Sequence, residues 1–247
     1  MTLSPDEIIF FAENGYLIKR GLLNSALMAQ ARDCWWAAAP PELEREHPDT
    51  WVGAFAESRW TWKYREPGAE PWMLQLLAQD PAITAIAEQL LGADLQVGQR
   101  IRGIYCVFPE GDVPERPTYC HVDQHPFHLG VVGYIDDVPP GGGGFTVWPG
   151  SHRTFYPTFK TRYSFQPTEH YRLVRDAVME QQPCECHGQA GDVVLWHHRL
   201  AHSAGHNRSR QVRQAVLYDF KKVDLVAVQD QPPHEDMWLD WPGVRGE

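Results

Sequence analysis

Apolar positions follow a helical period in the first third of the chain and short extended runs in the rest. The first helix is expected to begin at Ser4, which precedes Pro5 and stands three residues before Glu7, an arrangement typical of a capping box. Gly15 is expected to end this helix, because glycine adopts the left-handed conformation that closes many helices. Residues 16–18 (Tyr-Leu-Ile) then predict a short strand.

Two further helices are predicted in this part of the chain. Ser25 is expected to cap the second helix, which runs to Ala39 and ends at a pair of prolines. The third begins with Asp80 and a following proline, and its apolar residues recur at helical spacing until Gly92. Between these helices, residues 42–72 carry many aromatic side chains without a clear period. We expect them to pack as a flap over the core, with the wall of a substrate pocket as the alternative.

From residue 95 onward the pattern changes to short β runs separated by turn-forming residues. The expected strands are residues 95–108, 119–123, 130–135, 145–148, 193–197 and 212–220. Helices followed by many strands indicate a mainly β protein, a sandwich or barrel with flanking α-helices packed on one face. We expect a single domain over residues 1–247, with a helical part at about 1–92, a β core at about 93–222 and a C-terminal tail at 223–247.

Composition narrows the class of protein. The chain has 43% hydrophobic and 22% charged residues, a mean hydropathy of -0.43 and no apolar run long enough to span a bilayer, so we expect a soluble protein. Its N-terminus lacks the basic and apolar regions of a secretory signal. The net charge of -10 disfavours nucleic acid and anionic membranes as partners. A small molecule is the expected partner, and the sequence does not decide between a monomer and a homodimer.

The cysteines indicate a reducing compartment. They are five, an odd number, and no CxxC pair suggests a zinc ribbon, so we interpret them as reduced thiols of a cytoplasmic protein. Cys184 and Cys186 are the closest pair, and alternation along an edge strand explains their spacing more simply than a metal site does.

One short motif combines an imidazole and a carboxylate. His121 and Asp123 are two residues apart, so on extended backbone both side chains leave the same face and can share a metal. A second histidine would complete the facial triad that binds non-haem Fe(II) and leaves positions open, and His202 is our candidate. Strand alternation alone does not decide among the neighbouring histidines, which are His197, His198, His202 and His206.

An arginine stands in an apolar run further along the chain. Arg213 lies in the expected strand 212–220, and a guanidinium among apolar residues favours a planar anion. Arg208 and Arg210 fall instead in a polar loop, where a solvated role is expected. Arg213 is therefore the candidate anion-binding residue.

These residues, together with further motifs, resemble the phytanoyl-CoA dioxygenase family of Fe(II)/2-oxoglutarate oxygenases. The similar motifs are an opening helix with Asn-Gly-Tyr at 4–21, a Pro-Gly-Ser-His turn at 149–152, a Gly-Asp-Val strand start at 191–193 and a small-residue run with Asn at 203–207. They occur in the family's order over about residues 4–220. The resemblance implies a double-stranded β-helix, the cupin-like jelly roll.

The resemblance also implies the cofactors, which are Fe(II), 2-oxoglutarate as cosubstrate and O₂. The implied metal ligands are His121, Asp123 and His202, the last because it directly precedes the small-residue run. Arg213 would bind the far carboxylate of 2-oxoglutarate. Further contacts to the cosubstrate are expected from an upstream strand, whose candidates are Gln99, Arg102 and Tyr105.

The implied reaction hydroxylates or otherwise oxidises a C–H bond of a small organic metabolite and releases succinate and CO₂. Two alternatives stand beside it: a metal cupin enzyme that does not use 2-oxoglutarate, and a non-catalytic cupin-like binding or sensing protein. Dispersed basic residues favour a partly hydrophobic, uncharged or cationic substrate over a coenzyme A thioester. His197 and His198 are expected to be packed core imidazoles, and His152 a turn residue whose ring bonds backbone near the metal.

Overall fold

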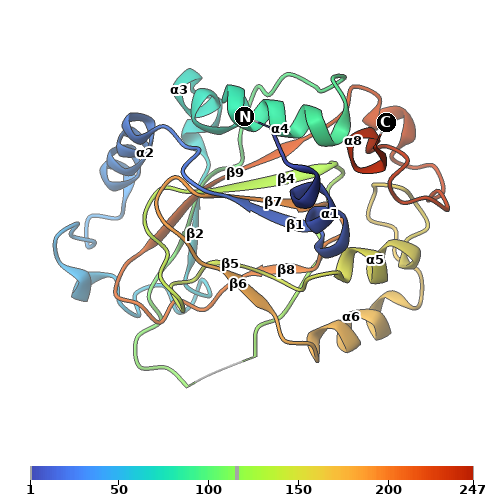
Figure 1. Cartoon of the computed structure of the whole chain (residues 1–247). Helices are drawn as coiled ribbons and strands as arrows, with labels where there is room; N and C mark the ends of the chain where they lie inside the picture. The colour runs from blue at the N-terminus through green and yellow to red at the C-terminus, as the bar shows by residue number, and fades with distance from the viewer. Residues whose placement is uncertain (1, 115–116, 247) are drawn as a thin grey trace.

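Six antiparallel strands form the sheet around which the chain is arranged (Figure 1). The computed structural model describes residues 2–114 and 117–246. In spatial order the strands are β1 (Tyr16–Lys19), β7 (Val193–His197), β4 (Leu129–Tyr134), β9 (Arg213–Phe220), β3 (Gly103–Val107) and β2 (Thr61–Tyr64). A second, three-stranded antiparallel sheet consists of β6 (Cys184–Cys186), β5 (Phe145–Val147) and β8 (His202–Ala204).

Helices flank these sheets. They are α1 (Pro5–Asn14), α2 (Ser25–Ala38), α3 (Pro71–Met73), α4 (Pro81–Leu91), α5 (Ser151–Phe155), α6 (Tyr171–Met179), α7 (Leu225–Val228) and α8 (Pro242–Arg245). Short 3₁₀ turns occupy Pro48–Thr50, Glu66–Ala69 and Tyr156–Thr158, and one π turn occupies Leu74–Ala78. Within the described part of the chain, no helix is both long and apolar enough to cross a membrane.

Alternation along the strands divides the core between the two faces of the larger sheet. Leu195 and Val216 pack with the helices on one face. Trp196 and Leu217, their neighbours in sequence, pack on the other face with Phe145 of the smaller sheet. Figure 1 shows α3 and α4 over the first face and the smaller sheet below the second. The prediction of a mainly β protein with flanking helices is therefore confirmed.

The first helix begins and ends as predicted. Ser4 Oγ accepts from the Glu7 N–H at 3.3 Å, and Glu7 Oε2 accepts from the Ser4 N–H at 2.8 Å. Gly15 ends the helix at φ +77°, and a side chain there would also collide with His152, since a Cβ would lie 2.5 Å from its Nδ1. This tight approach carries the chain directly into β1.

The prediction for the second helix needs a correction. Asn24 is the cap, because its Oδ1 accepts from the N–H groups of Ala26 and Leu27 at 3.0 and 3.1 Å. Ser25 is the first helical residue, and the helix ends at Ala38. An asparagine carbonyl can reach two helix-start donors at once, so it occupies the cap although serine is equally common there.

Two predicted strands also need correction. The run 95–108 is extended only at its end, as β3, and Leu95 makes one isolated bridge. The run 119–123 forms no strand, and only His121 pairs, in a bridge to His202. The other four predicted strands agree with β4, β5, β7 and β9 within one residue at each end. β6 was anticipated as an edge strand, and all five cysteines are free.

The aromatic segment 42–72 packs as expected but contains structure that its pattern did not indicate. Trp51 is buried, and Trp62 and Trp72 pack partly buried against the helical side of the core. β2 lies within the segment and pairs with β3 at the edge of the large sheet.

The C-terminal segment packs tightly against the rest of the chain. α8 lies against α1 and α4 (Figure 1). Trp241, which is 0% exposed, has its ring centre 5.6 Å from that of Phe11 and 5.0 Å from that of His197. This segment therefore closes one end of the β core.

Candidate metal centre

A single antiparallel bridge sets the geometry of the predicted metal ligands. The His121 N–H donates to the His202 carbonyl at 3.0 Å, and the His202 N–H donates to the His121 carbonyl at 2.9 Å. The two imidazole rings consequently lie side by side, with centres 4.4 Å apart. Asp123 Oδ2 lies 3.5 Å from His202 Nε2. Potential ligand atoms of all three residues fall within 4.8 Å of one another, so the structure brings the predicted triad together.

Contacts with neighbouring residues fix the orientation of the His202 ring. Its Nδ1 lies 3.0 Å from the Leu200 carbonyl, which assigns the proton to Nδ1 and leaves the Nε2 lone pair facing Asp123 and His121. The ring stacks on Phe145 at 5.1 Å and contacts Trp196 at 5.6 Å. His202 is buried, whereas His121 is exposed as a residue although the surrounding groups desolvate its ring. The core therefore holds one side of the triad, and the other side is open.

The protonation states suit a cation. Burial lowers the pKa of His121 to about 3, helped by the neighbouring His202, and burial also lowers the pKa of His202. For Asp123 burial raises the pKa, but His202 and Arg102 outweigh it and hold the pKa below its usual value. Two neutral imidazoles and one ionised carboxylate are the forms in which these side chains bind metals.

Arg102, a predicted cosubstrate contact, lies directly behind the triad. Its guanidinium binds both oxygens of Asp219, at 2.6 and 2.7 Å, and Oδ2 of Asp123 at 3.1 Å. His125 Nε2 also lies 2.9 Å from Asp219. The structure thus places Arg102 between two carboxylates, where it orients the proposed metal ligand Asp123.

Two neighbours of the triad were not found from the sequence. Asp219 could have been found from the sequence, because it is a carboxylate in an apolar run and lies on the same strand face as Arg213, six residues earlier. No sequence pattern pointed to Lys63, since its strand lies in the irregular aromatic segment. Its Nζ lies 5.1 Å from the centre of the Tyr105 ring, and its charge helps lower the pKa of His121.

Arg213 is a buried cation on the same face of the sheet as the triad. Its Nε donates to the Gly143 carbonyl at 2.8 Å and its Nη1 to the Tyr105 carbonyl at 3.3 Å. Among the residues that the structure describes, no carboxylate pairs with it. Burial lowers its pKa. A guanidinium held by carbonyls without a counter-ion is suited to bind an anion. Tyr105, another predicted contact, adjoins Arg213 through this carbonyl.

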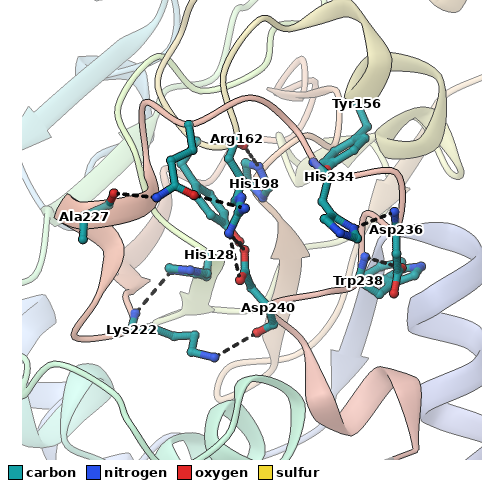
Figure 2. A network of polar contacts seen from close by, with 12 residues as sticks. His128, Tyr156, Arg162, His198, Lys222, Ala227, His234, Asp236, Trp238 and Asp240 are labelled. Atoms are coloured by element: carbon teal, nitrogen blue, oxygen red, sulfur yellow. Dashed lines mark hydrogen bonds and ion pairs between the residues drawn. The ribbon is translucent and has the colours of Figure 1, made fainter.

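The rival histidines all lie elsewhere. His206 Nδ1 pairs with Glu110 Oε1 at 2.8 Å. His197 and His198 are buried imidazoles, as expected, in a second group with His128 that packs beneath the C-terminal segment. We call His128, His197 and His198 the buried histidine cluster; Figure 2 shows His128 and His198 beside Asp240. His152 bonds backbone, as predicted, but the carbonyl is that of Ala12 in α1, at 3.2 Å.

Two facing antiparallel sheets with flanking helices are the arrangement of cupin-like jelly-roll oxygenases. The chain matches the phytanoyl-CoA dioxygenase (PhyH) family over residues 11–215 and belongs to that family. The resemblance found in the sequence is thereby confirmed, as is the expectation of a dioxygenase. No match was found among curated proteins.

Solved structures with the same fold support the jelly-roll prediction. The non-haem α-ketoglutarate-dependent carbocyclase SnoK from nogalamycin biosynthesis is 21% identical, with a TM-score of 0.57 over 95% of each chain. EctD from S. alaskensis, with 2-oxoglutarate and 5-hydroxyectoine, is 20% identical, with a TM-score of 0.60 over 90% of this chain and 77% of that chain. HygX from Streptomyces hygroscopicus, with nickel, 2-oxoglutarate and hygromycin B, is 14% identical, with a TM-score of 0.56 over 93% of this chain and 97% of that chain.

Proposed function

We propose that the protein is a non-haem Fe(II)- and 2-oxoglutarate-dependent dioxygenase in which His121, Asp123 and His202 hold the iron. The observation that carries this proposal is the convergence of the three ligand atoms within 4.8 Å beside an open side. Two histidines and a carboxylate on one face leave coordination positions for cosubstrate and O₂. Iron is bound in structures of the neighbours EctD and HygX, which supports the same metal here.

Each residue around the iron has a distinct task in this proposal. Bound iron supplies the activation of O₂, which the side chains alone do not provide. Leu200 fixes the tautomer of His202 through its carbonyl, and Arg102 fixes the orientation of Asp123. Asp219 holds Arg102 in turn, with both carboxylate oxygens engaged. The ligand set is thus oriented before any metal binds.

Arg213 is the proposed anchor for the far carboxylate of 2-oxoglutarate. Two carbonyls hold its Nε and Nη1, which leaves Nη2 without a protein partner among the described residues. A planar guanidinium binds carboxylates through parallel hydrogen bonds. Tyr105, whose carbonyl positions Arg213, stays a candidate contact to the cosubstrate. Arg102 acts on cosubstrate binding only indirectly, because it holds the proposed metal ligand Asp123.

The proposed substrate is a small, partly hydrophobic metabolite, uncharged or cationic, that is oxidised as 2-oxoglutarate is converted to succinate and CO₂. EctD and HygX are seen with 5-hydroxyectoine and hygromycin B, which supports small organic molecules as the class. The net charge of -10 favours such molecules over the polyphosphate of coenzyme A thioesters.

Succinate formation tests this proposal. Purified protein with Fe(II) and 2-oxoglutarate would be given neutral polycyclic molecules, cationic amino compounds, free fatty acids and acyl-coenzyme A thioesters, each at low and moderate salt. We expect substrate-stimulated succinate with members of the first two classes. Stimulation by thioesters alone, weakening as salt rises, would overturn the substrate class. No 2-oxoglutarate-dependent succinate under any condition, with or without added compound, would overturn the reaction itself.

A further inference from the structure

A cavity of about 450 Å³ lies on the face of the large sheet that is turned away from the metal centre. Its lining includes Val212 and Gln214 at the start of β9. Arg213, between them, points to the opposite face, because successive strand residues alternate. None of the three proposed metal ligands lines this cavity, so it is a separate site from the catalytic one.

Two tryptophans form its aromatic wall. The rings of Trp36 on α2 and Trp51 have centres 5.2 Å apart and are tilted by 52°. Trp51 Nε1 donates to the Arg210 carbonyl at 3.0 Å, which fixes that ring. Tryptophan faces are the strongest aromatic partners of organic cations and also stack on rings.

The lining includes one buried side-chain amide, that of Gln214. Gln214 is 2% exposed, and its buried Oε1 has no hydrogen-bond partner among the residues that the structure describes. Buried polar atoms in folded proteins are almost always paired, so this oxygen indicates a missing donor. A ligand that brings an N–H group into the cavity would satisfy it.

The charges around the cavity favour a cation. Arg32 pairs with Asp136 at 2.6 Å, and Arg45 pairs with Asp33 at 2.7 Å, so both lining arginines are already neutralised. In the described part of the chain, the lining carboxylates of Glu46 and Asp137 form no ion pair. Asp137 only accepts the Ala190 N–H, at 2.8 Å. The lining therefore keeps a negative excess.

We propose that this cavity binds a small organic cation, an ammonium or guanidinium group attached to a ring or other apolar body. The side-chain amide of Gln214 turns to present Oε1 to the cavity, where the cationic N–H donates to it. The charge is balanced by Asp137 and Glu46, and the apolar body lies against Trp36 and Trp51. Each of these three interactions comes from a different feature of the lining, and a neutral or anionic ligand would lose at least one.

Calorimetric titration of the full-length protein tests the site with three probes of matched shape: benzylammonium, benzyl alcohol and benzoate. We expect benzylammonium to bind most tightly, with equal affinity whether or not Fe(II) and 2-oxoglutarate are present. Gln214→Leu should weaken it about tenfold, the size of one lost hydrogen bond to a charged group. Asp137→Asn, which keeps an oxygen for the Ala190 N–H, should weaken it about threefold.

Glu88→Gln on α4 is the matched control, since it removes an exposed carboxylate far from the lining and should leave the affinity unchanged. If Gln214→Leu does not fold, the comparison of benzylammonium affinity between Asp137→Asn and Glu88→Gln still tests the proposal. Equal binding of the three probes would overturn the proposal, as would equal affinities in Asp137→Asn and Glu88→Gln. Loss of benzylammonium binding on addition of 2-oxoglutarate would place it in the catalytic site instead.

Discussion

The same two stretches of chain supply two groups of histidines that behave differently. Residues 121–128 place His121 in the candidate metal centre and His128 in the buried histidine cluster. Residues 197–202 likewise divide between His202 in the metal centre and His197 with His198 in the cluster. Burial lowers the pKa of all five, so neutral imidazole is common to both groups. The environment of the rings, and not their charge, separates a candidate metal centre from core packing.

The difference lies in the carboxylates and in the direction of the ring nitrogens. In the metal centre, Asp123 and both imidazoles converge on one point. In the cluster, His198 Nε2 faces the Arg162 carbonyl at 3.2 Å, and the Lys222 N–H donates to His128 Nδ1 at 3.3 Å. Asp240, the carboxylate nearby in Figure 2, accepts from Tyr163 and contacts Arg162. Among the residues that the structure describes, the group whose potential ligand atoms lie close enough to hold a metal is His121, Asp123 and His202, and it includes no member of the cluster.

Replacement of the proposed ligands should break the metal centre alone. Alanine at His121, Asp123 or His202 is expected to reduce 2-oxoglutarate turnover by far more than the roughly 100-fold that loss of an outer partner of a metal ligand produces. His198→Gln should keep most of the turnover. Succinate assays with iron content measured on the same samples would check this. Normal iron and activity in the His202 variant, with both lost in the His198 variant, would exchange the roles of the two groups.

Truncation of Trp241 should affect stability far more than chemistry. Its ring is fully buried against Phe11 and His197, so Trp241→Ala is expected to lower the free energy of unfolding by about 3–5 kcal/mol. Urea unfolding gives the value, and Trp238→Ala, at a partly buried position, should cost less. An equal loss in both variants would contradict the assignment of Trp241 as the main anchor of the C-terminal segment.

Acid should destabilise the fold through the buried imidazoles. Burial lowers the pKa of His128 to about 3 and that of His152 to about 4, while the unfolded chain titrates near 6.5. The unfolded state therefore binds protons first as pH falls, and stability present above pH 6.5 is lost toward those lower values. Each group should contribute about 2 kcal/mol of loss between pH 7 and pH 5. His128→Gln should make this pH dependence shallower in urea unfolding; an unchanged slope would contradict the explanation.

Arg213→Lys should have an effect that is confined to the cosubstrate. Lysine keeps the positive charge but loses the planar fork, so the apparent requirement for 2-oxoglutarate should rise about 10- to 100-fold while iron is retained. Arg210→Lys is the control, because Arg210 is exposed and pairs with Asp49 at the surface. The same 2-oxoglutarate dependence in wild type and Arg213→Lys would remove Arg213 as the anchor.

The side chains of the candidate metal centre could be predicted from the sequence, but the backbone that was expected to carry them differs from the one in the structure. The prediction put His121 and Asp123 on one face of a strand at 119–123, whereas the structure has a single bridge there, which joins His121 to His202. Local periodicity predicted the buried strands and the capped helices, because those patterns follow from neighbours in sequence. β2 was missed because it forms by pairing with a distant strand in a segment without alternation.

The contacts behind the ligands depend even more on the tertiary structure. Arg102 was identified as near the site, but its attachment to Asp219 joins residues 117 positions apart and no local pattern encodes it. Strand parity does not choose between His198 and His202. The resemblance to the family indicated His202, and the bridge between His121 and His202 places these two residues side by side.

The central claim is that His121, Asp123 and His202 form an iron site that binds 2-oxoglutarate, while the buried histidine cluster does not bind metal. Anaerobic titration of Fe(II) and 2-oxoglutarate into metal-free protein, followed by visible absorption, tests it directly in wild type, His202→Ala and His198→Gln. We predict a charge-transfer band that requires both components, persists in His198→Gln and is absent in His202→Ala. A band of full intensity in His202→Ala, or none in the wild type, would contradict the claim.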